Sequence, residues 1–204
     1  EKYFSEAGLL FSAQHHRTLK LIDVDGYFTN AALLLSDQCE HSIKCAVYSG
    51  IGKTKFKARK EFFGSILKQL DDAYEYVSLS NNLNTVFEGL KRIDRPDYPP
   101  EAIREALLNA VIHRDYDYSG STIINIYDDR MEFISLGGLV KGITLLDIMQ
   151  GISQPRNPTI ADVFYRLALI ESYGTGIQKI YESYSDSIRK PEIQTAPASF
   201  VLML

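Results

Sequence analysis

Hydrophobic and polar positions recur with two different periods along this 204-residue chain, and those periods predict its helices and strands. The clearest helical pattern covers residues 100–113, where apolar side chains fill most of the circumference. Glu105, Asn109 and His113 recur every four residues and share one narrow face. Pro100 suits the first turn of a helix, because that turn leaves its N–H groups unbonded. The pattern therefore predicts a largely buried helix with one polar stripe.

A polar stripe on a buried helix has to be satisfied. An unpaired buried polar group costs about 1–3 kcal/mol, so these side chains need hydrogen-bond partners or a wet cavity. One interpretation is that Glu105 and Asn109 face a pocket. The other is that both bond neighbouring backbone and that His113 caps the helix C-terminus, where a cation is favoured. The spacing alone leaves both interpretations open.

The rest of the chain predicts an α+β fold, because strands and helices are intermixed without a regular β-α alternation. Predicted helices cover residues 6–20, 30–35, 61–77, 144–149, 157–169 and 177–184. Predicted strands cover residues 43–48, 85–93, 122–127, 130–135, 191–194 and 200–204, and residues 49–60 read as a loop. Arg95-Pro96-Asp97 marks the predicted boundary between a smaller α+β segment, residues 1–95, and a second domain, residues 96–204.

Charge and cysteine content argue against some classes of protein. A net charge of −4 argues against a protein whose whole surface binds nucleic acid. Two cysteines are too few for a secreted disulfide scaffold, so the predicted compartment is the cytoplasm, and no apolar run is long enough to cross a membrane. Gly52-Lys53-Thr54 is not a P-loop, because Val47 stands where that motif needs glycine.

One concentrated basic run stands out against the acidic background. It consists of Lys53, Lys55, Lys57, Arg59 and Lys60. Such a run can contact the phosphates of DNA or RNA. Such a run is more often a solvated turn, and contact with nucleic acid remains the alternative.

Two glycine turns add candidate ligand contacts. Gly137-Gly138 directly follows a predicted strand, and Gly174-Thr175-Gly176 opens a predicted helix. Glycines before a helix can form an anion site, because free N–H groups and the helix dipole point at the ligand. A glycine turn without a ligand is the common alternative.

The polar stripe and the glycine turns together resemble the GHKL ATP-binding fold of gyrase, Hsp90 and sensor histidine kinases. Four strings carry a closer resemblance, to transcriptional regulators related to the C-terminal part of the ATP-dependent DNA helicase RecG. They are R-E-A-L-L-N-A-V-I-H-R-D-Y, D-D-R-M-E-F-I-S-L-G-G-L, S-Q-P-R-N-P and E-S-Y-G-T-G-I. The resemblance extends over roughly residues 30–204 and implies a GHKL-like α/β sandwich with a mixed sheet in residues 96–204. It also implies that a Schlafen AlbA-type domain precedes this region.

The resemblance assigns roles to individual residues. Glu105 would be the catalytic base that orients water, and Asn109 would be the Mg²⁺ ligand, with His113 on the same cofactor-binding face. Gly137 and Gly138 would match the adenine-side glycines, and Gly174, Thr175 and Gly176 the phosphate-binding lid. The implied cofactors are ATP and Mg²⁺.

The sequence also departs from GHKL ATPases. Their glycine box supplies an aspartate to the adenine amino group, whereas F-I-S-L-G-G-L contains none. Two hypotheses follow. The first is a regulator with a nucleotide-binding module and slow or absent hydrolysis, whose DNA contacts come mainly from the preceding domain. The second is a non-catalytic DNA-associated regulator whose fold serves dimerisation, as in a homodimer, or partner contact. The chain shows no Walker A motif, which argues against a helicase motor.

Overall fold

The protein is built on one six-stranded mixed sheet in the order β2-β1-β5-β6-β8-β7. The computed structural model describes residues 2–9, 11–171 and 173–204. β1 pairs parallel to β5, and the other neighbouring strands pair antiparallel. The strands are β1 (Ile43–Tyr48), β2 (Phe56–Phe62), β5 (Thr122–Ile126), β6 (Met131–Leu136), β7 (Glu192–Ala196) and β8 (Ser199–Met203). The predicted α+β class with a mixed sheet is confirmed.

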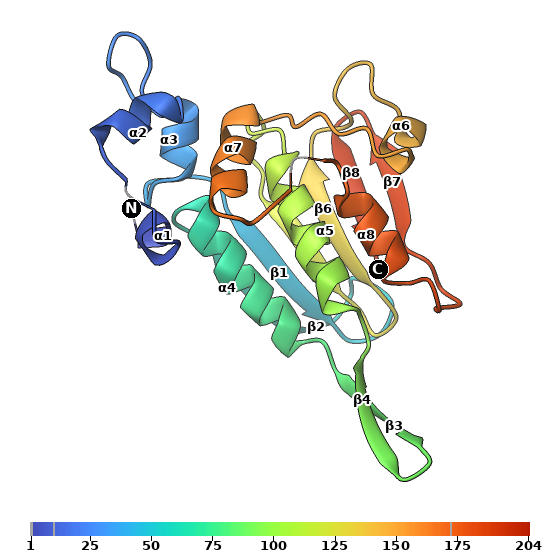
Figure 1. Cartoon of the computed structure of the whole chain (residues 1–204). Coiled ribbons are helices and arrows are strands. Elements are labelled where there is room, and N and C mark those ends of the chain that lie inside the picture. The colour runs from blue at the N-terminus through green and yellow to red at the C-terminus, as the bar shows by residue number, and fades with distance from the viewer. Residues whose placement is uncertain (1, 10, 172) are drawn as a thin grey trace.

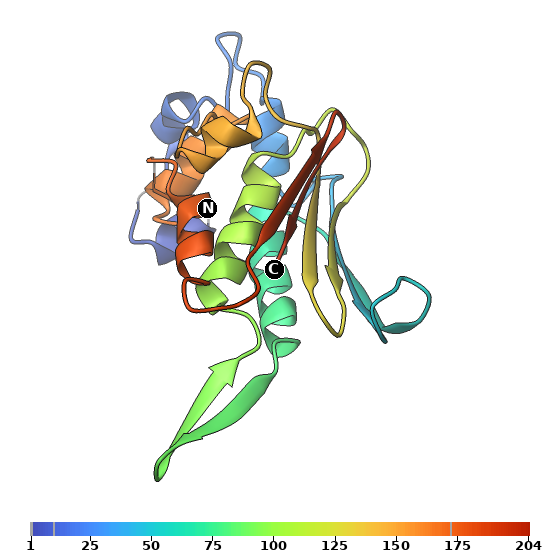
Figure 2. The same cartoon turned by 90° about the vertical axis from the view of Figure 1, so that its right-hand side faces the viewer.

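Helices cover one face of this sheet, as Figures 1 and 2 show. They are α1 (Lys2–Glu6), α2 (Ala13–Thr18), α3 (Asn30–Leu34), α4 (Ile66–Leu79), α5 (Pro100–Ile112), α6 (Leu145–Met149), α7 (Pro158–Arg166) and α8 (Gly176–Glu182). The result is the predicted GHKL-like α/β sandwich. Strands β1 and β2 precede residue 96, and they join the same sheet as the strands that follow it. The division into residues 1–95 and 96–204 stays a prediction.

Helix α5 lies at the centre of the helical layer. Its apolar side chains, including Ile103 and Leu107, are almost fully buried together with Ile124 and Phe133 of the sheet. The Ser135 hydroxyl of β6 donates a 2.9 Å hydrogen bond to the backbone oxygen of Ala110, which fixes the helix against the sheet. The predicted helix is therefore confirmed, with His113 as its C-terminal cap residue.

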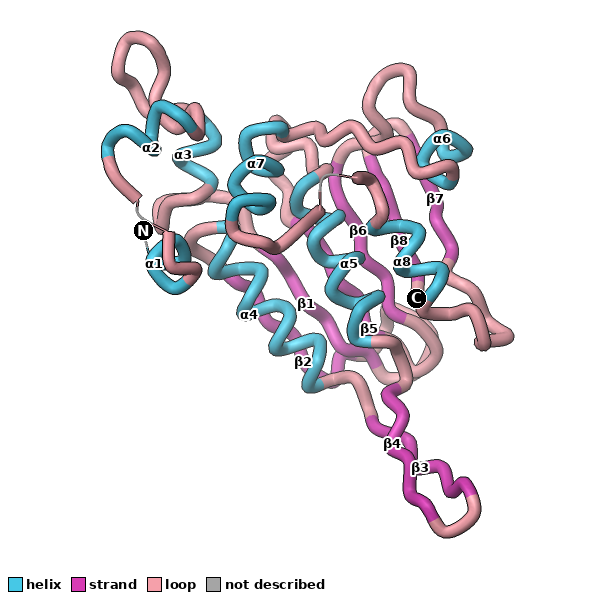
Figure 3. Tube along the Cα trace, viewed as in Figure 1, coloured by secondary structure: helices cyan, strands magenta, loops and turns pink. Residues whose placement is uncertain are grey.

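A two-stranded arm projects from the body between α4 and α5 (Figure 3). It consists of β3 (Leu83–Glu88) and β4 (Lys91–Pro96), which form a separate sheet. The prediction of one strand over residues 85–93 is wrong, because Gly89, at φ +63°, reverses the chain there. At the base of the arm, the Asn81 side chain bonds both the backbone N–H and the backbone oxygen of Tyr98.

Three further predictions are corrected. Residues 56–60 are not loop but strand β2, paired with β1, and α4 begins at Ile66 rather than at residue 61. Lysine and arginine side chains on β2 suit an edge strand, where charge discourages pairing with other chains. A continuous helix over residues 6–20 is also wrong. The helical conformation is interrupted at Gly8, which has φ +69°, and residue 10 lies outside the described residues.

A buried carboxylate joins the β1–β2 loop to the β5–β6 hairpin. Glu132 accepts hydrogen bonds from Asn125 Nδ2 (3.1 Å), the Tyr127 hydroxyl (3.2 Å) and Arg130 Nε (2.9 Å). Lys53 Nζ lies 3.5 Å from the same carboxylate. Burial raises the pKa of Glu132, but these hydrogen bonds and cations outweigh it and hold the pKa below its ordinary value.

Replacing Glu132 with glutamine should lower the free energy of unfolding by about 1–3 kcal/mol at pH 7, because a charged acceptor is lost from several donors. A group with a depressed pKa stabilises the fold above its ordinary value of 4.5 and loses that effect as the pH falls. Urea unfolding of the wild type and of Glu132→Gln should therefore converge below about pH 4.5. Glu192→Gln, on an exposed side chain, is the control and should differ little from the wild type. A constant difference at all pH values would contradict this account.

Candidate functional site

A cavity of about 900 Å³ lies between α5, α7, α8 and the segment 138–155. Seven of the eight predicted catalytic and cofactor-binding residues line it: Glu105, Asn109, His113, Gly138, Gly174, Thr175 and Gly176. Gly137 is not among the lining residues. The polar stripe therefore faces a cavity, although α5 is otherwise buried in the core. A cavity of this size can bury a small molecule such as a nucleotide.

Glu105 and Asn109 differ in which of their polar atoms lack a hydrogen-bond partner. Asn109 Nδ2 donates a 2.8 Å hydrogen bond to the backbone oxygen of Glu105. Among the described residues nothing bonds Asn109 Oδ1, so this oxygen can accept from a ligand or bind a cation. Glu105 Oε1 lies 2.5 Å from Arg104 Nη1. Burial raises the pKa of Glu105, while Arg104 and Lys179 act in the opposite direction.

His113 lies at the other end of the stripe. Burial, with a smaller contribution from Arg156, lowers the pKa of His113 to about 4. The imidazole is therefore neutral at pH 7, and it does not act as a cationic cap of α5. A neutral imidazole has one ring nitrogen that donates and one that accepts.

The turn that opens α8 lies directly against the stripe. A Cβ atom on Gly176 would lie 2.8 Å from Glu105 Oε2 and 3.1 Å from Asn109 Nδ2, so any larger residue there would require these two side chains to move. The Thr175 hydroxyl donates to Glu171, which also pairs with Lys179 at 2.9 Å. Ser172, in the same motif, lies outside the described residues.

The glycine pair after β6 is enclosed by other backbone. Gly137 has φ +93°, and a Cβ on it would lie 2.5 Å from Asp115 Cβ. A Cβ on Gly138 would lie 2.8 Å from the backbone oxygen of Pro197. The two glycines therefore allow three chain segments to pack closely together. Gly138 also lines the cavity.

The S-Q-P-R-N-P segment, for which no functional role was predicted, connects this wall to α5. Arg156 pairs with Asp115 at 3.2 Å and donates to the backbone oxygen of Gly138 at 2.8 Å. The Asn157 side chain donates to the backbone oxygens of Ile112 (2.8 Å) and Arg114 (2.7 Å), at the C-terminal end of α5. We call Asp115, Arg156 and Asn157 the clamp. Asn157 directly before Pro158 is a recognisable helix start, but its partners are not readable from the sequence.

Several charged and polar lining residues were also missed. They are Arg104, Ser135, Asp162, Glu171 and Lys179. Arg104 directly precedes Glu105, and Lys179 lies one turn into the predicted helix after Gly176. The positions of Arg104, Asp162 and Lys179 in predicted helices made them candidates, but the sequence does not show in which direction their side chains point.

The basic run lies away from the cavity, on β2 and the loop before it. Lys53 pairs with Glu132 at 3.5 Å, and Lys57 pairs with Asp128 at 2.7 Å. None of the five residues of the run is among those that line the cavity. Contact of this run with nucleic acid stays a prediction.

No group of three or more histidine, cysteine, aspartate or glutamate side chains in the described ranges is placed to hold a metal ion. No helix in this part of the chain has the length and apolarity needed to span a bilayer.

Comparisons with known proteins agree with the fold. Residues 120–204 match the family model described as "Putative ATP-dependent DNA helicase recG C-terminal". The search of curated proteins found no match. The crystal structure of the DIP2311 protein from Corynebacterium diphtheriae superposes with a TM-score of 0.85 and 26% sequence identity over 100% of this chain. This chain spans 42% of the length of that protein.

Proposed function

We propose that this chain is the nucleotide-binding module of a larger transcriptional regulator and that it binds ATP with Mg²⁺. The observation that carries the proposal is that Glu105 and Asn109 line the same cavity as the turn Gly174-Thr175-Gly176. The match to an ATP-dependent family over residues 120–204 supports it.

The donors and charges of the cavity fit a magnesium nucleotide. Asn109 Oδ1 is free to bind Mg²⁺, which prefers oxygen ligands and usually takes few of them from protein. Mg²⁺ would neutralise phosphate charge. Arg104 and Lys179 offer positive charge beside the same stripe, although each now pairs with a carboxylate. Because a Cβ on Gly176 would lie within 3.1 Å of both Glu105 and Asn109, little space separates the turn from the stripe, and the phosphates would lie beside this point or displace the start of α8.

Hydrolysis by this site should be slow or absent. Glu105 would orient a water molecule, and burial raises its pKa, which favours a general base. However, Arg104 pairs with the same carboxylate and lowers its basicity. Nucleotide binding would then act as a signal within the regulator, with DNA contacts supplied mainly by other parts of the longer protein.

A titration with ATP, GTP and ADP, with and without Mg²⁺, tests this function. ATP at 100 times its dissociation constant should stabilise the fold by about 2.7 kcal/mol, measured by thermal shift and calorimetry. The shift should shrink when EDTA removes Mg²⁺. If no nucleotide shifts the transition, the alternative holds that the fold serves dimerisation or partner contact. Sedimentation analysis would then measure the oligomeric state.

A further inference from the structure

Arg114, directly after the C-terminal cap residue of α5, carries a buried positive charge. The residue is only 1% exposed, and it forms no ion pair with any described residue. Asp115, its neighbour in sequence, pairs with Arg156 at 3.2 Å instead. Arginine stays protonated in proteins, so the charge cannot be removed by loss of a proton. A buried charge is costly unless it is paired, and Arg114 therefore needs a compensating group.

The guanidinium group of Arg114 uses only part of its hydrogen-bonding capacity. Nη2 donates to the backbone oxygens of Tyr118, at 2.7 Å, and Gly120, and to Nδ1 of His41, at 3.1 Å. Nε and Nη1 are buried and have no partner among the described residues. These two nitrogens carry three of the five N–H groups of an arginine side chain. The unpaired N–H groups therefore require a hydrogen-bond acceptor from outside the described chain.

A small pocket of about 10 Å³ lies beside Arg114, and we call it the Arg114 pocket. It shares no lining residue with the large cavity. Its volume leaves room for about one particle of the size of a water molecule. Its other polar lining residues are His41, Ser42, Gln69, Tyr116 and Thr122.

These polar neighbours do not neutralise Arg114. His41 accepts from Arg114 through Nδ1, and burial, with a contribution from the Arg114 charge, lowers the pKa of His41, so the ring is neutral. Burial raises the pKa of Tyr116, whose hydroxyl donates to the backbone oxygen of Val111 at 3.0 Å. The Tyr116 ring, 5.0 Å from Arg114 Cζ, stabilises the cation only through its π-electrons. Arg114 therefore remains the one charged residue that lines this pocket among those described.

A carboxylate behind the pocket wall is already engaged. The Ser42 hydroxyl donates to Glu61 Oε1 at 2.6 Å, and Glu61 also pairs with Lys44 at 3.5 Å. Neither interaction brings Glu61 to the guanidinium group of Arg114. The pocket thus combines a net positive charge with unpaired N–H donors.

We propose that the Arg114 pocket binds one monoatomic anion, such as chloride, through the unpaired N–H groups of Arg114. A halide accepts these hydrogen bonds and neutralises the buried charge, whereas a water molecule accepts them and leaves the charge in place. Polyatomic anions such as acetate, phosphate and sulfate exceed the volume of the pocket. The pocket is separate from the large cavity, so the inference does not rest on nucleotide binding.

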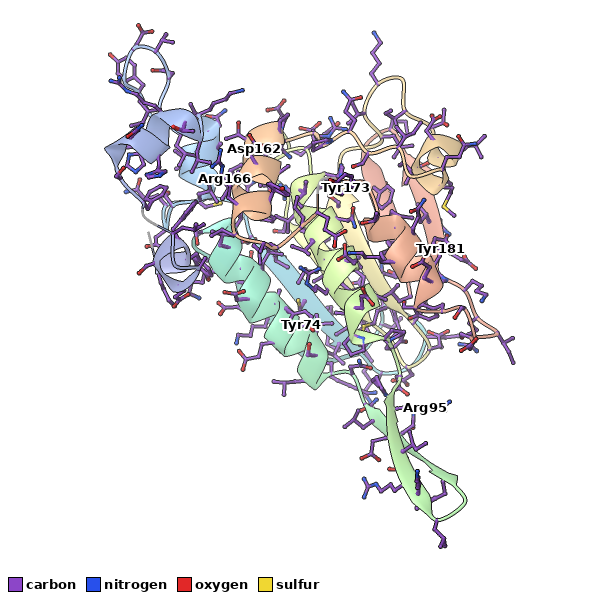
Figure 4. All side chains as sticks on the ribbon, viewed as in Figure 1. Tyr74, Arg95, Asp162, Arg166, Tyr173 and Tyr181 are labelled. Carbon is purple, nitrogen blue, oxygen red and sulfur yellow. The ribbon has the colours of Figure 1, made fainter. Side chains whose placement is uncertain are left out.

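Thermal unfolding in sodium chloride and in sodium acetate, at equal ionic strength, tests the site. Chloride should raise the melting temperature of the wild type saturably, by about 2–4 °C relative to Arg114→Met in the same salts. The comparison between proteins removes the general effects of the two salts on stability. Arg114→Met lacks the charge and the donors and should lose the chloride-specific shift. Arg166→Met makes the same change at an exposed arginine of α7, labelled in Figure 4 and outside both cavities, and should keep the shift.

A crystal of the wild type grown in sodium bromide gives a second measurement that needs no variant. Bromide should produce an anomalous peak within hydrogen-bonding distance of Nε or Nη1 of Arg114. No chloride-specific shift in the wild type, or no such peak, would show that the pocket holds only water and would overturn the proposal. A chloride-specific shift retained in Arg114→Met would place the ion elsewhere, with the same consequence. If Arg114→Met does not fold, the wild-type shift and the bromide peak together decide.

Discussion

Replacing Asn109 with alanine should weaken Mg²⁺-ATP binding by about 10- to 100-fold, because the variant loses the free carboxamide oxygen of the polar stripe. The same change should cost little stability. Asn109 Nδ2 donates to the backbone oxygen of Glu105, and that oxygen also accepts the regular helical hydrogen bond from residue 109. A large loss of affinity with a small change in melting temperature would therefore identify Asn109 as a ligand-binding residue.

Glu105→Gln is the matched variant one turn earlier. The amide keeps the shape of the side chain but is a poor base, so nucleotide binding should persist and any hydrolysis should disappear. The raised pKa of Glu105 gives the sign of the stability effect. The folded protein holds this proton more tightly than the unfolded chain, so the ionised group disfavours folding as the pH rises through the folded pKa. Removing the charge should therefore not lower the melting temperature at pH 7.

Two measurements on the same two variants decide between the interpretations of the stripe. They are the affinity, measured by titration calorimetry, and the melting temperature, measured by scanning calorimetry. If the stripe is purely structural, both variants lose stability and neither loses affinity. That combination would show that Asn109 and Glu105 do not form a binding site. Retained hydrolysis in Glu105→Gln would show that another group orients the water.

The sequence predicted α5 well because its signals are local. The four-residue spacing of Glu105, Asn109 and His113 and the proline at the first turn all act within one element. The polar stripe predicted the cavity because buried polar groups need partners or space. The edge strand β2 was missed because alternate charged residues, such as Lys57 and Arg59, do not show a buried face when both faces of the strand are exposed.

The rest of the site depends on contacts between distant segments. Arg156 meets Asp115 across 41 residues of sequence, and Asn157 meets Ile112 across 45 residues. No periodicity encodes such a meeting. The location of Asp162 could not be predicted for the same reason. The helical spacing of α7 shows which residues share its face, but not that this face borders a cavity. The sequence therefore located the central helix of the site, and the fold supplied the opposite wall.

A substitution in the clamp should lower the stability of the fold more than either substitution in the polar stripe. Asn157→Asp keeps the size of the side chain and adds a charge that is favourable at the N-terminus of α7, but it removes the donors for the backbone oxygens of Ile112 and Arg114. Leaving these acceptors unpaired should lower the free energy of unfolding by about 2–4 kcal/mol, measured by urea denaturation. Gln154→Ala, at an exposed lining residue in the same segment with no bond to any described residue, is the control and should unfold like the wild type.

Loss of the clamp should also loosen the cavity. Because Asn157 joins the wall that carries Gly138 and Asp162 to the end of α5, Asn157→Asp should weaken nucleotide binding even at temperatures where the variant is fully folded. Saturating ATP would then restore only part of the lost stability, since ligand binding adds stability in proportion to the logarithm of concentration over the dissociation constant. Wild-type affinity in a destabilised Asn157→Asp protein would show that the clamp supports the fold without positioning the site. Wild-type stability in that variant would show that the two carbonyl groups find other donors and that the Asn157 side chain does not stabilise the fold.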